Sequence, residues 1–190
     1  MSKRTPGLPQ RPRGFWPTPL DAVRPLIPHL PAEADWIEPC AGAGDLIRHL
    51  AHLWPGGRLC AAYDLVPQAD GIEEADALQL DLRPDLYVTN PPWPVSGKRG
   101  DPALGIIKHL ARLAPTWMLL PWDFAANVYY AEVSRFCVQV VPIGRVSWLG
   151  NGQGGKDNAA WFEFDAGHCA GTVLHSRGLV HAPQGQVSVG

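Results

Sequence analysis

Short apolar runs alternate with amphipathic segments along most of this chain. The runs at 35–37, 59–63, 86–89 and 117–120 have strand character, and helical periodicity follows residues 18, 45 and 103. This alternation is typical of a largely parallel sheet whose crossover connections are helices. With 190 residues, 46% of them hydrophobic, the chain can bury one core. We therefore expect a single α/β domain.

Turn and cap residues give finer expectations. Thr18 is expected to cap a helix that starts with Pro19, and further helices are expected at 103–113 and 125–136. An edge strand is expected within 71–75, and strands at 137–141, 146–149 and 160–164, which include an antiparallel hairpin. The predicted organisation is a disordered basic arm at 1–14, the folded domain at 15–166 and a weakly structured tail at 167–190.

Charge and cysteine usage restrict the partners and the compartment. The formal net charge is -2, so attraction to a polyanion must come from local patches. One such patch is the acid-free start of the chain, which carries Lys3, Arg4, Arg11 and Arg13. The four cysteines lack zinc-type spacing and are expected to be buried thiols, and no apolar run is long enough to cross a bilayer. The sequence thus predicts a cytoplasmic monomer or homodimer without a metal.

The segment from Glu38 to Gly44 has the composition of a tight strand-to-helix turn beside a ligand. Gly42 and Gly44 let the backbone turn sharply, and the helix start that follows offers unpaired N–H groups. A dinucleotide fingerprint would require glycine at 47, where Ile47 stands, so a diphosphate-bearing cofactor is disfavoured. An ordinary strand-to-helix turn could carry the same glycines.

Two acids downstream favour a cofactor in this turn. Asp64 follows the second strand, where one carboxylate can accept both hydroxyls of a ribose. Asp76 and Ala77 come where a third strand should end and could meet an adenine amine and ring nitrogen. A surface acid or a cap is the other reading of Asp76. A cofactor with a ribose but no diphosphate fits these residues, and S-adenosylmethionine is such a cofactor.

The sharpest signal is Asn90-Pro91-Pro92-Trp93 at the end of a strand. An exocyclic amine on a base is a poor nucleophile, because its lone pair is delocalised into the ring. The side-chain carbonyl of Asn90 and the backbone carbonyl of Pro91 could accept its two N–H groups and favour a pyramidal nitrogen. Trp93 could offer a flat face on which a base stacks. A proline-rich turn is the alternative interpretation of this tetrapeptide.

These residues together resemble the S-adenosylmethionine-dependent amino methyltransferases of the DNA adenine (N6) type. Their order is similar to the gamma arrangement, in a small phage-like form. The resemblance implies a Rossmann-like, mostly parallel seven-stranded sheet with an antiparallel C-terminal hairpin. It implies Asn90, Pro91, Pro92 and Trp93 as catalytic residues. It implies a cofactor-binding set of Phe15, Thr18, Pro19, Glu38, Pro39, Cys40, Gly42, Gly44, Asp64, Leu65, Asp76, Ala77 and Asn90.

The substrate is less constrained than the chemistry. Besides Trp93, the candidate substrate contacts are Lys98, Arg99, Arg145 and Lys156, all of which could equally be solvated loop charges. No segment is long enough for a separate target-recognition domain, so we expect DNA adenine methylation with low sequence specificity. The alternatives are methylation of an RNA base amine, methylation of a protein glutamine amide, and a catalytically inert methyltransferase-like binding module.

Overall fold

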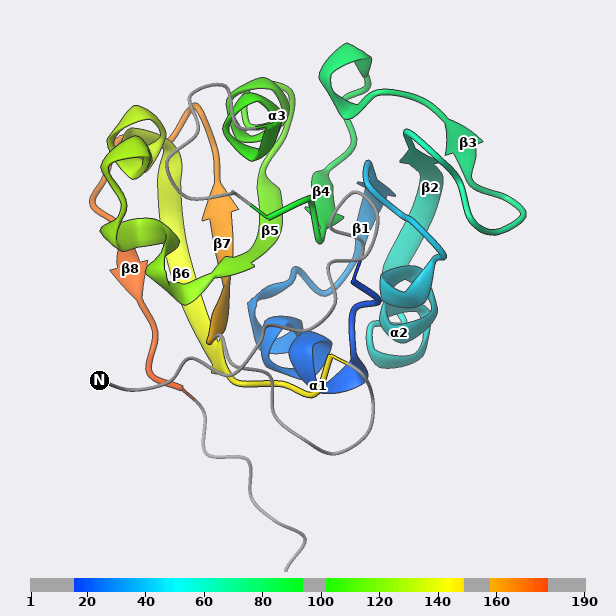
Figure 1. The fold of residues 1–190 in the computed structure, drawn as a ribbon, viewed down its shortest axis with the longest axis horizontal. Coiled ribbons are helices and arrows are strands. Elements are labelled where there is room, and N and C mark those ends of the chain that lie inside the picture. Colours follow the sequence, from blue (N-terminus) through cyan, green and yellow to red (C-terminus); the bar gives the residue numbers. More distant parts are fainter. Residues whose placement is uncertain (1–15, 94–101, 149–157, 178–190) are drawn as a thin grey trace, which may run out of the picture.

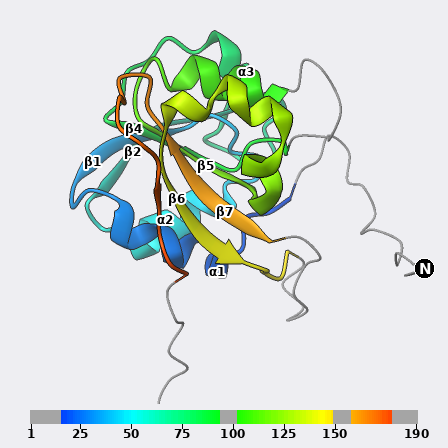
Figure 2. The same cartoon turned by 90° about the vertical axis from the view of Figure 1, so that its left-hand side faces the viewer.

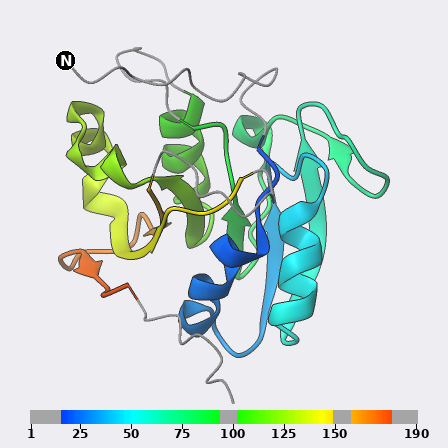
Figure 3. The same cartoon turned by 60° about the horizontal axis from the view of Figure 1, so that its bottom comes forward.

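The computed structural model describes residues 16–93, 102–148 and 158–177, which form a sheet with helices on both faces (Figure 1). The eight strands follow the order β3-β2-β1-β4-β5-β7-β6-β8, with β3 and β8 at opposite ends (Figure 3). The strands are β1 (Ala34–Glu38), β2 (Gly57–Asp64), β3 (Glu73–Glu74), β4 (Leu86–Thr89), β5 (Thr116–Pro121), β6 (Cys137–Gly144), β7 (Ala159–Phe164) and β8 (Val173–Leu174). The predicted α/β class is confirmed, with eight strands instead of seven.

Strand directions bring the carboxyl ends of most strands to one edge. β1 pairs in parallel with β2 and β4, and β4 in parallel with β5. β7 is antiparallel to both of its neighbours, β5 and β6, as the predicted hairpin requires (Figure 2). The segments that follow β1, β2, β4, β5 and β6 therefore emerge on the same side of the sheet, where ligands bind in open α/β folds.

Alternating residues of the central strands fill two separate cores. Trp36, Val88 and Trp117 face the core under the first helices, whereas Ile37 and Tyr87, their neighbours in sequence, face the opposite core. Both faces are covered, which explains why these strands read as continuous apolar runs and not as an alternation of apolar and polar residues.

The helices are shorter than the sequence predicts. One face carries α1 (Leu20–Val23), the 3-10 helix η2 (Arg24–His29) and α2 (Asp45–Leu53), and α3 (Pro102–Leu110) covers the other (Figure 1). The cap of α1 is Pro19 and not Thr18, so that expectation is wrong. Pro25 and Pro28 lack the N–H groups that an α-helix would need there, and the helix continues as a 3-10 segment.

Two segments differ from expectation in the second half of the chain. In place of one helix at 125–136 there are three 3-10 helices, η4 (Trp122–Ala126), η5 (Val128–Glu132) and η6 (Ser134–Phe136). Earlier in the chain, the 3-10 helix η3 (Ala77–Gln79) precedes β4. Asn127 is extended, and its side chain donates to the carbonyl of Asp123, which competes with helical bonding. Residues 146–148 form no strand, because Gly144 (φ +76°) turns the chain out of the sheet.

The predicted tail and thiols also need correction. Within 167–190, β8 pairs in parallel with β6, so residues 173–174 belong to the sheet; 178–190 lie outside the described residues, as do the arm at 1–14 and Leu149. Cys137 is buried, but Cys60 and Cys169 are exposed. None of the described helices has the length and apolar character needed to span a membrane.

Candidate active site

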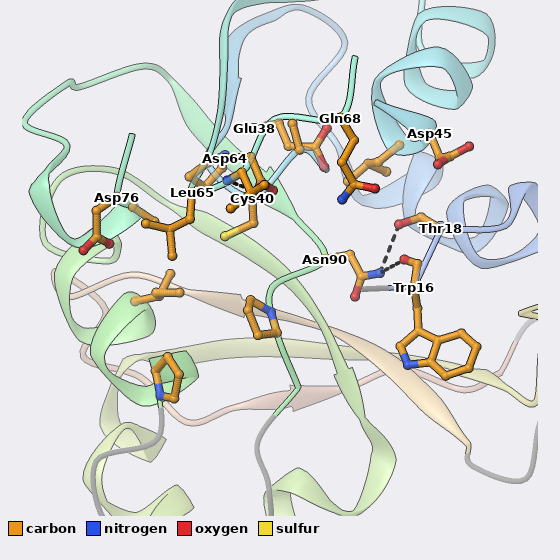
Figure 4. Close-up of a pocket in the computed structure, with 18 of the residues that line it drawn as sticks. Trp16, Thr18, Glu38, Cys40, Asp45, Asp64, Leu65, Gln68, Asp76 and Asn90 are labelled. Atoms are coloured by element: carbon orange, nitrogen blue, oxygen red, sulfur yellow. Dashed lines mark hydrogen bonds between the residues drawn. The ribbon is translucent and has the colours of Figure 1, made fainter. Parts of the chain in front are cut away.

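A cavity of about 910 Å³ opens at the carboxyl ends of β1, β2 and β4 (Figure 4). Its walls come from the segment before α1, the turn after β1, the loop after β2, the start of η3 and the end of β4. The volume lies within the range of small-molecule and cofactor sites, roughly 300–1,000 Å³. Four carboxylates line it, and no lysine, arginine or histidine does so among the described residues: Glu38, Asp45, Asp64 and Asp76.

The glycine turn is held in place by Asp64. Gly42 and Gly44 have φ values of +54° and +75°, a region that residues with a Cβ rarely adopt. One carboxylate oxygen of Asp64 accepts the N–H of Gly42 at 2.7 Å, and the other accepts that of Val66 at 2.8 Å. Each oxygen keeps a further lone pair. Asp64 therefore joins the turn after β1 to the loop after β2 and can still accept a ligand hydroxyl.

Glu38 is a buried carboxylate with an incomplete set of partners. Its side chain is 1% exposed, and its Oε2 atom has no hydrogen-bond partner among the described residues. Burial raises the pKa of Glu38 well above its ordinary value, and the neighbouring carboxylates of Asp64 and Asp45 raise it further. An unpaired carboxylate at the wall of a cavity is costly for the fold. It is therefore suited to meet a cationic ligand group.

Asp76 has a structural contact as well as a position in the cavity. Its Oδ1 accepts the N–H of Leu78 at 2.9 Å, so Asp76 caps η3. The alternative interpretation of Asp76 as a cap is therefore correct. In the view of Figure 4, Asp76 and Trp16 lie toward opposite ends of the cavity with Asn90 between them. Ala77 and Leu78 line the wall next to Asp76.

The carboxamide of Asn90 is fixed in one orientation. Its Nδ2 donates to the backbone carbonyl of Trp16 at 3.2 Å and to Oγ1 of Thr18 at 3.1 Å (Figure 4). Both hydrogens of the amide are thus used, so the Oδ1 atom is the polar atom of this side chain that remains for a ligand. Thr18, 5% exposed, works as an acceptor for Asn90 and not as a helix cap.

Trp93 takes a different position from the one expected. Its indole N–H lies 3.1 Å from Oδ1 of Asn90 and 3.0 Å from the carbonyl oxygen of Leu119, and donates to both. Its ring meets that of Trp148 edge to face, with centroids 5.0 Å apart. Trp93 is not among the described residues that line the cavity, and its predicted stacking role stays a prediction. It is partly buried, packs against the core and contacts Asn90.

Most of the predicted site residues come together. Of the predicted set, the cavity is lined by Thr18, Glu38, Pro39, Cys40, Asp64, Leu65, Asp76, Ala77, Asn90 and Pro92. Gly42 and Gly44 shape its turn without lining it, and neither Pro19 nor Pro91 lines it; Arg145 is exposed beyond β6. Phe15, Lys98, Arg99 and Lys156 lie outside the described residues.

Several lining residues were missed by the sequence reading. Trp16 and Asp45 flank predicted positions, and Asp45, an acid in the first turn of the helix after the glycines, was a usable signal. Gln68 lines the cavity from the loop after β2, where its backbone N–H donates to the carbonyl of Gly42 at 3.0 Å. Pro102 and Ile106 line the cavity from α3. They are far in sequence from the other lining residues, and no sequence pattern linked them to the cavity. The described residues contain no cluster suited to hold a metal ion.

Solved structures establish the fold. The chain is similar to a proposed RNA methyltransferase from Pyrococcus horikoshii, with a TM-score of 0.64, 11% identity and coverage of 84% of this chain and 92% of the other. The fold is that of class I methyltransferases. A proposed class I S-adenosylmethionine-dependent methyltransferase from Listeria monocytogenes aligns with a TM-score of 0.53 and 9% identity, over 86% of this chain and 64% of that one.

A third similar structure is the modification subunit of a proposed type I restriction enzyme from Vibrio vulnificus. Its TM-score is 0.53 at 14% identity, and the alignment covers 84% of this chain but 46% of that larger one. Neither a family model nor a curated protein matches the sequence. The neighbours therefore fix the architecture, and the chemistry must be argued from this chain's own residues.

Proposed function

We propose that this chain is an S-adenosylmethionine-dependent methyltransferase that acts on the exocyclic amine of adenine in DNA, with low sequence specificity. The observation that carries the proposal is the hydrogen-bonding state of Asn90. Both of its amide hydrogens are held by Trp16 and Thr18, so the side chain offers a substrate an acceptor and no donor. A group with N–H donors satisfies that acceptor, whereas a carbonyl would be repelled.

The cavity suits the proposed cofactor in charge as well as in size. Four carboxylates without a basic side chain among the described lining disfavour a phosphate-bearing nucleotide. They favour a ligand with positive charge, and the unpaired Oε2 of Glu38 would receive the cofactor's ammonium group. Asp64 would hold the ribose hydroxyls, and Asp76 with Ala77 the adenine ring.

Residues at the end of β4 would prepare the amine. Oδ1 of Asn90 would accept one N–H, and the carbonyl of Pro91 would accept the other. These two bonds localise the nitrogen lone pair by drawing the amine out of the plane of its ring. S-adenosylmethionine, when bound, supplies a sulfonium methyl group, which the nitrogen takes as the carbon–sulfur bond breaks with its electron pair on sulfur and one N–H proton is released.

A base is preferred over a protein amide for two reasons. Trp16 lines the cavity next to Asn90 and gives a planar substrate an aromatic neighbour. Proteins of similar fold include a proposed RNA methyltransferase and the modification subunit of a proposed restriction enzyme. Adenine in DNA follows from the resemblance of the Asn90–Trp93 motif to the adenine-N6 enzymes.

Two synthetic duplexes separate the acceptors. Poly(dA·dT) carries its exocyclic amine on adenine, and poly(dI·dC) carries it on cytosine. The protein is incubated with methyl-labelled cofactor and each duplex, and also with total RNA and with cell lysate. We expect label in poly(dA·dT), recovered as N6-methyladenine after digestion to nucleosides, and none with Asn90→Ala. Label in RNA or protein without label in DNA would overturn the DNA assignment.

The inert binding module is tested separately. Isothermal titration with S-adenosylmethionine should show binding by the wild type and by Asn90→Ala, because Asn90 works on the acceptor side. Absence of binding up to millimolar cofactor would leave the proposal without its first step and support the inert module.

A further inference from the structure

Two exposed arginines from distant parts of the chain, Arg145 and Arg177, lie at the end of β6. Gly144 is the last residue of β6, and the guanidinium group of Arg177 lies against its backbone: a Cβ built on Gly144 would sit 2.7 Å from Cζ of Arg177. Arg145 follows directly. β8 brings Arg177 there by pairing with β6, and in Figure 1 the orange segment after β8 runs toward the yellow end of β6. We define Arg145 and Arg177 as the arginine pair.

The arginine pair has no counter-charge in the described chain. Neither residue takes part in the ion pairs between described residues, although the guanidinium of Arg177 and the backbone that carries Arg145 are neighbours. An exposed guanidinium group that has no counter-charge can bind an anion from solution. The planar N–H donors of an arginine match the paired oxygens of a phosphate or a carboxylate.

The arginine pair lies at the same edge of the sheet as the cavity. The chain leaves β6 at Arg145 and reaches Trp148 three residues later, a span of at most roughly 10 Å. The ring of Trp148 contacts that of Trp93, whose N–H bonds to Asn90. Trp148 and Trp93 thus connect the segment that leaves β6 at Arg145 to the amine-binding residue.

Charge separates the two locations. The cavity presents four carboxylates, which accept a neutral base but repel a phosphate. The arginine pair outside it has the opposite charge. A flipped or single-stranded nucleotide fits this arrangement, with its base in the cavity and the neighbouring backbone on the arginines.

We propose that Arg145 and Arg177 form a phosphate-binding site for the nucleic-acid backbone next to the nucleotide whose base enters the cavity. The inference rests on the proposed function for the identity of the polymer. It gives the C-terminal segment a role in substrate binding, since the pairing of β8 with β6 brings Arg177, three residues after β8, to the end of β6.

The test measures binding directly and does not depend on methyl transfer. Fluorescein-labelled DNA oligonucleotides, single-stranded and duplex, are titrated with full-length protein between 50 and 200 mM salt. Arg145→Gln and Arg177→Gln should each reduce affinity roughly five- to tenfold at 0.1 M salt, and should reduce the slope of log affinity against log salt by about one. Arg177→Lys keeps the charge and should retain most of that slope.

Arg112→Gln is the matched control, because this exposed arginine lies after α3 at the opposite edge of the sheet, ahead of β5. It should bind DNA like the wild type. Wild-type affinity and slope in both glutamine variants, or equal loss in Arg112→Gln, would overturn the phosphate site. Arginine-dependent DNA binding without methylation of any polymer would retain the site and refute the proposed function; methylation of DNA with no effect of the arginines would do the reverse.

Discussion

The indole N–H of Trp93 donates to Oδ1 of Asn90 at 3.1 Å and to the carbonyl of Leu119 at 3.0 Å. Trp93 thereby connects the side chain of Asn90 to strand β5. Together with the bonds of Nδ2 to Trp16 and Thr18, this contact prevents the carboxamide from flipping. A phenylalanine or tyrosine ring at 93 could stack in the same place but has no N–H in the ring plane.

Trp93→Phe should therefore lower kcat while the dissociation constant for S-adenosylmethionine stays unchanged. Loss of one hydrogen bond that orients a reacting group corresponds to about 1–2 kcal/mol, or roughly a tenfold fall in kcat. Steady-state kinetics with a DNA substrate and titration with cofactor give the two numbers. If Trp93 instead stacked on the substrate base, the phenylalanine variant would retain kcat and raise KM.

Asp64 should contribute to stability as well as to cofactor binding. Asp64→Ala leaves the N–H groups of Gly42 and Val66 without their acceptor, and hydrogen bonds to a charged group are worth about 1.5–3 kcal/mol each. We expect the free energy of unfolding to fall by about 3 kcal/mol or more, measured in urea, and cofactor affinity to fall with it. Asp70→Ala, an exposed acid of the same loop, is the control and should change neither.

Glu38→Gln should stabilise the cofactor-free protein at neutral and alkaline pH. Because the pKa of Glu38 is raised in the fold, the native state holds a proton that the unfolded chain releases above its ordinary pKa of 4.5. Stability is therefore lost as pH rises through the raised pKa. The glutamine variant removes this loss and should melt several degrees higher than the wild type at pH 8, with a much smaller difference near pH 4.5, as scanning calorimetry would measure.

The same carboxylate makes cofactor binding depend on pH. An ammonium group beside Glu38 favours its ionised form, so binding should release a proton wherever Glu38 is protonated beforehand. Calorimetric titration of the wild type in two buffers of different ionisation enthalpy should reveal this release, and Glu38→Gln should lose both the release and most of the affinity. Equal binding enthalpies in the two buffers for the wild type would count against the role of Glu38.

Local patterns predicted which residues line the cavity edge because these residues follow strands in order. Glu38, Asp64 and Asn90 each end an apolar run, and parallel pairing of those runs brings the three together. The orientation of Trp93 could not be predicted in this way, since its partners come from β5 and from Trp148. β8 was missed because it is two residues long and exposed on both faces, so that no periodicity marks it.

His29 should make the fold less stable at acidic pH. Their rings meet edge to face with centroids 4.3 Å apart, and a ring nitrogen of His175 lies 2.6 Å from Oε1 of Gln139 on β6. Burial lowers the pKa of His29 below 6.5, and the proximity of His175 lowers it further. The unfolded chain therefore binds a proton more readily than the native state, so stability is fully present above pH 6.5 and falls as the pH drops below it.

His29→Phe keeps a ring against His175 and Trp117 without the charge, and it should lose less stability than the wild type between pH 7.5 and 5.5, measured as the shift in urea midpoint. The contribution of Glu38 is common to both proteins and cancels in this comparison, so equal shifts would exclude His29 as the group that titrates.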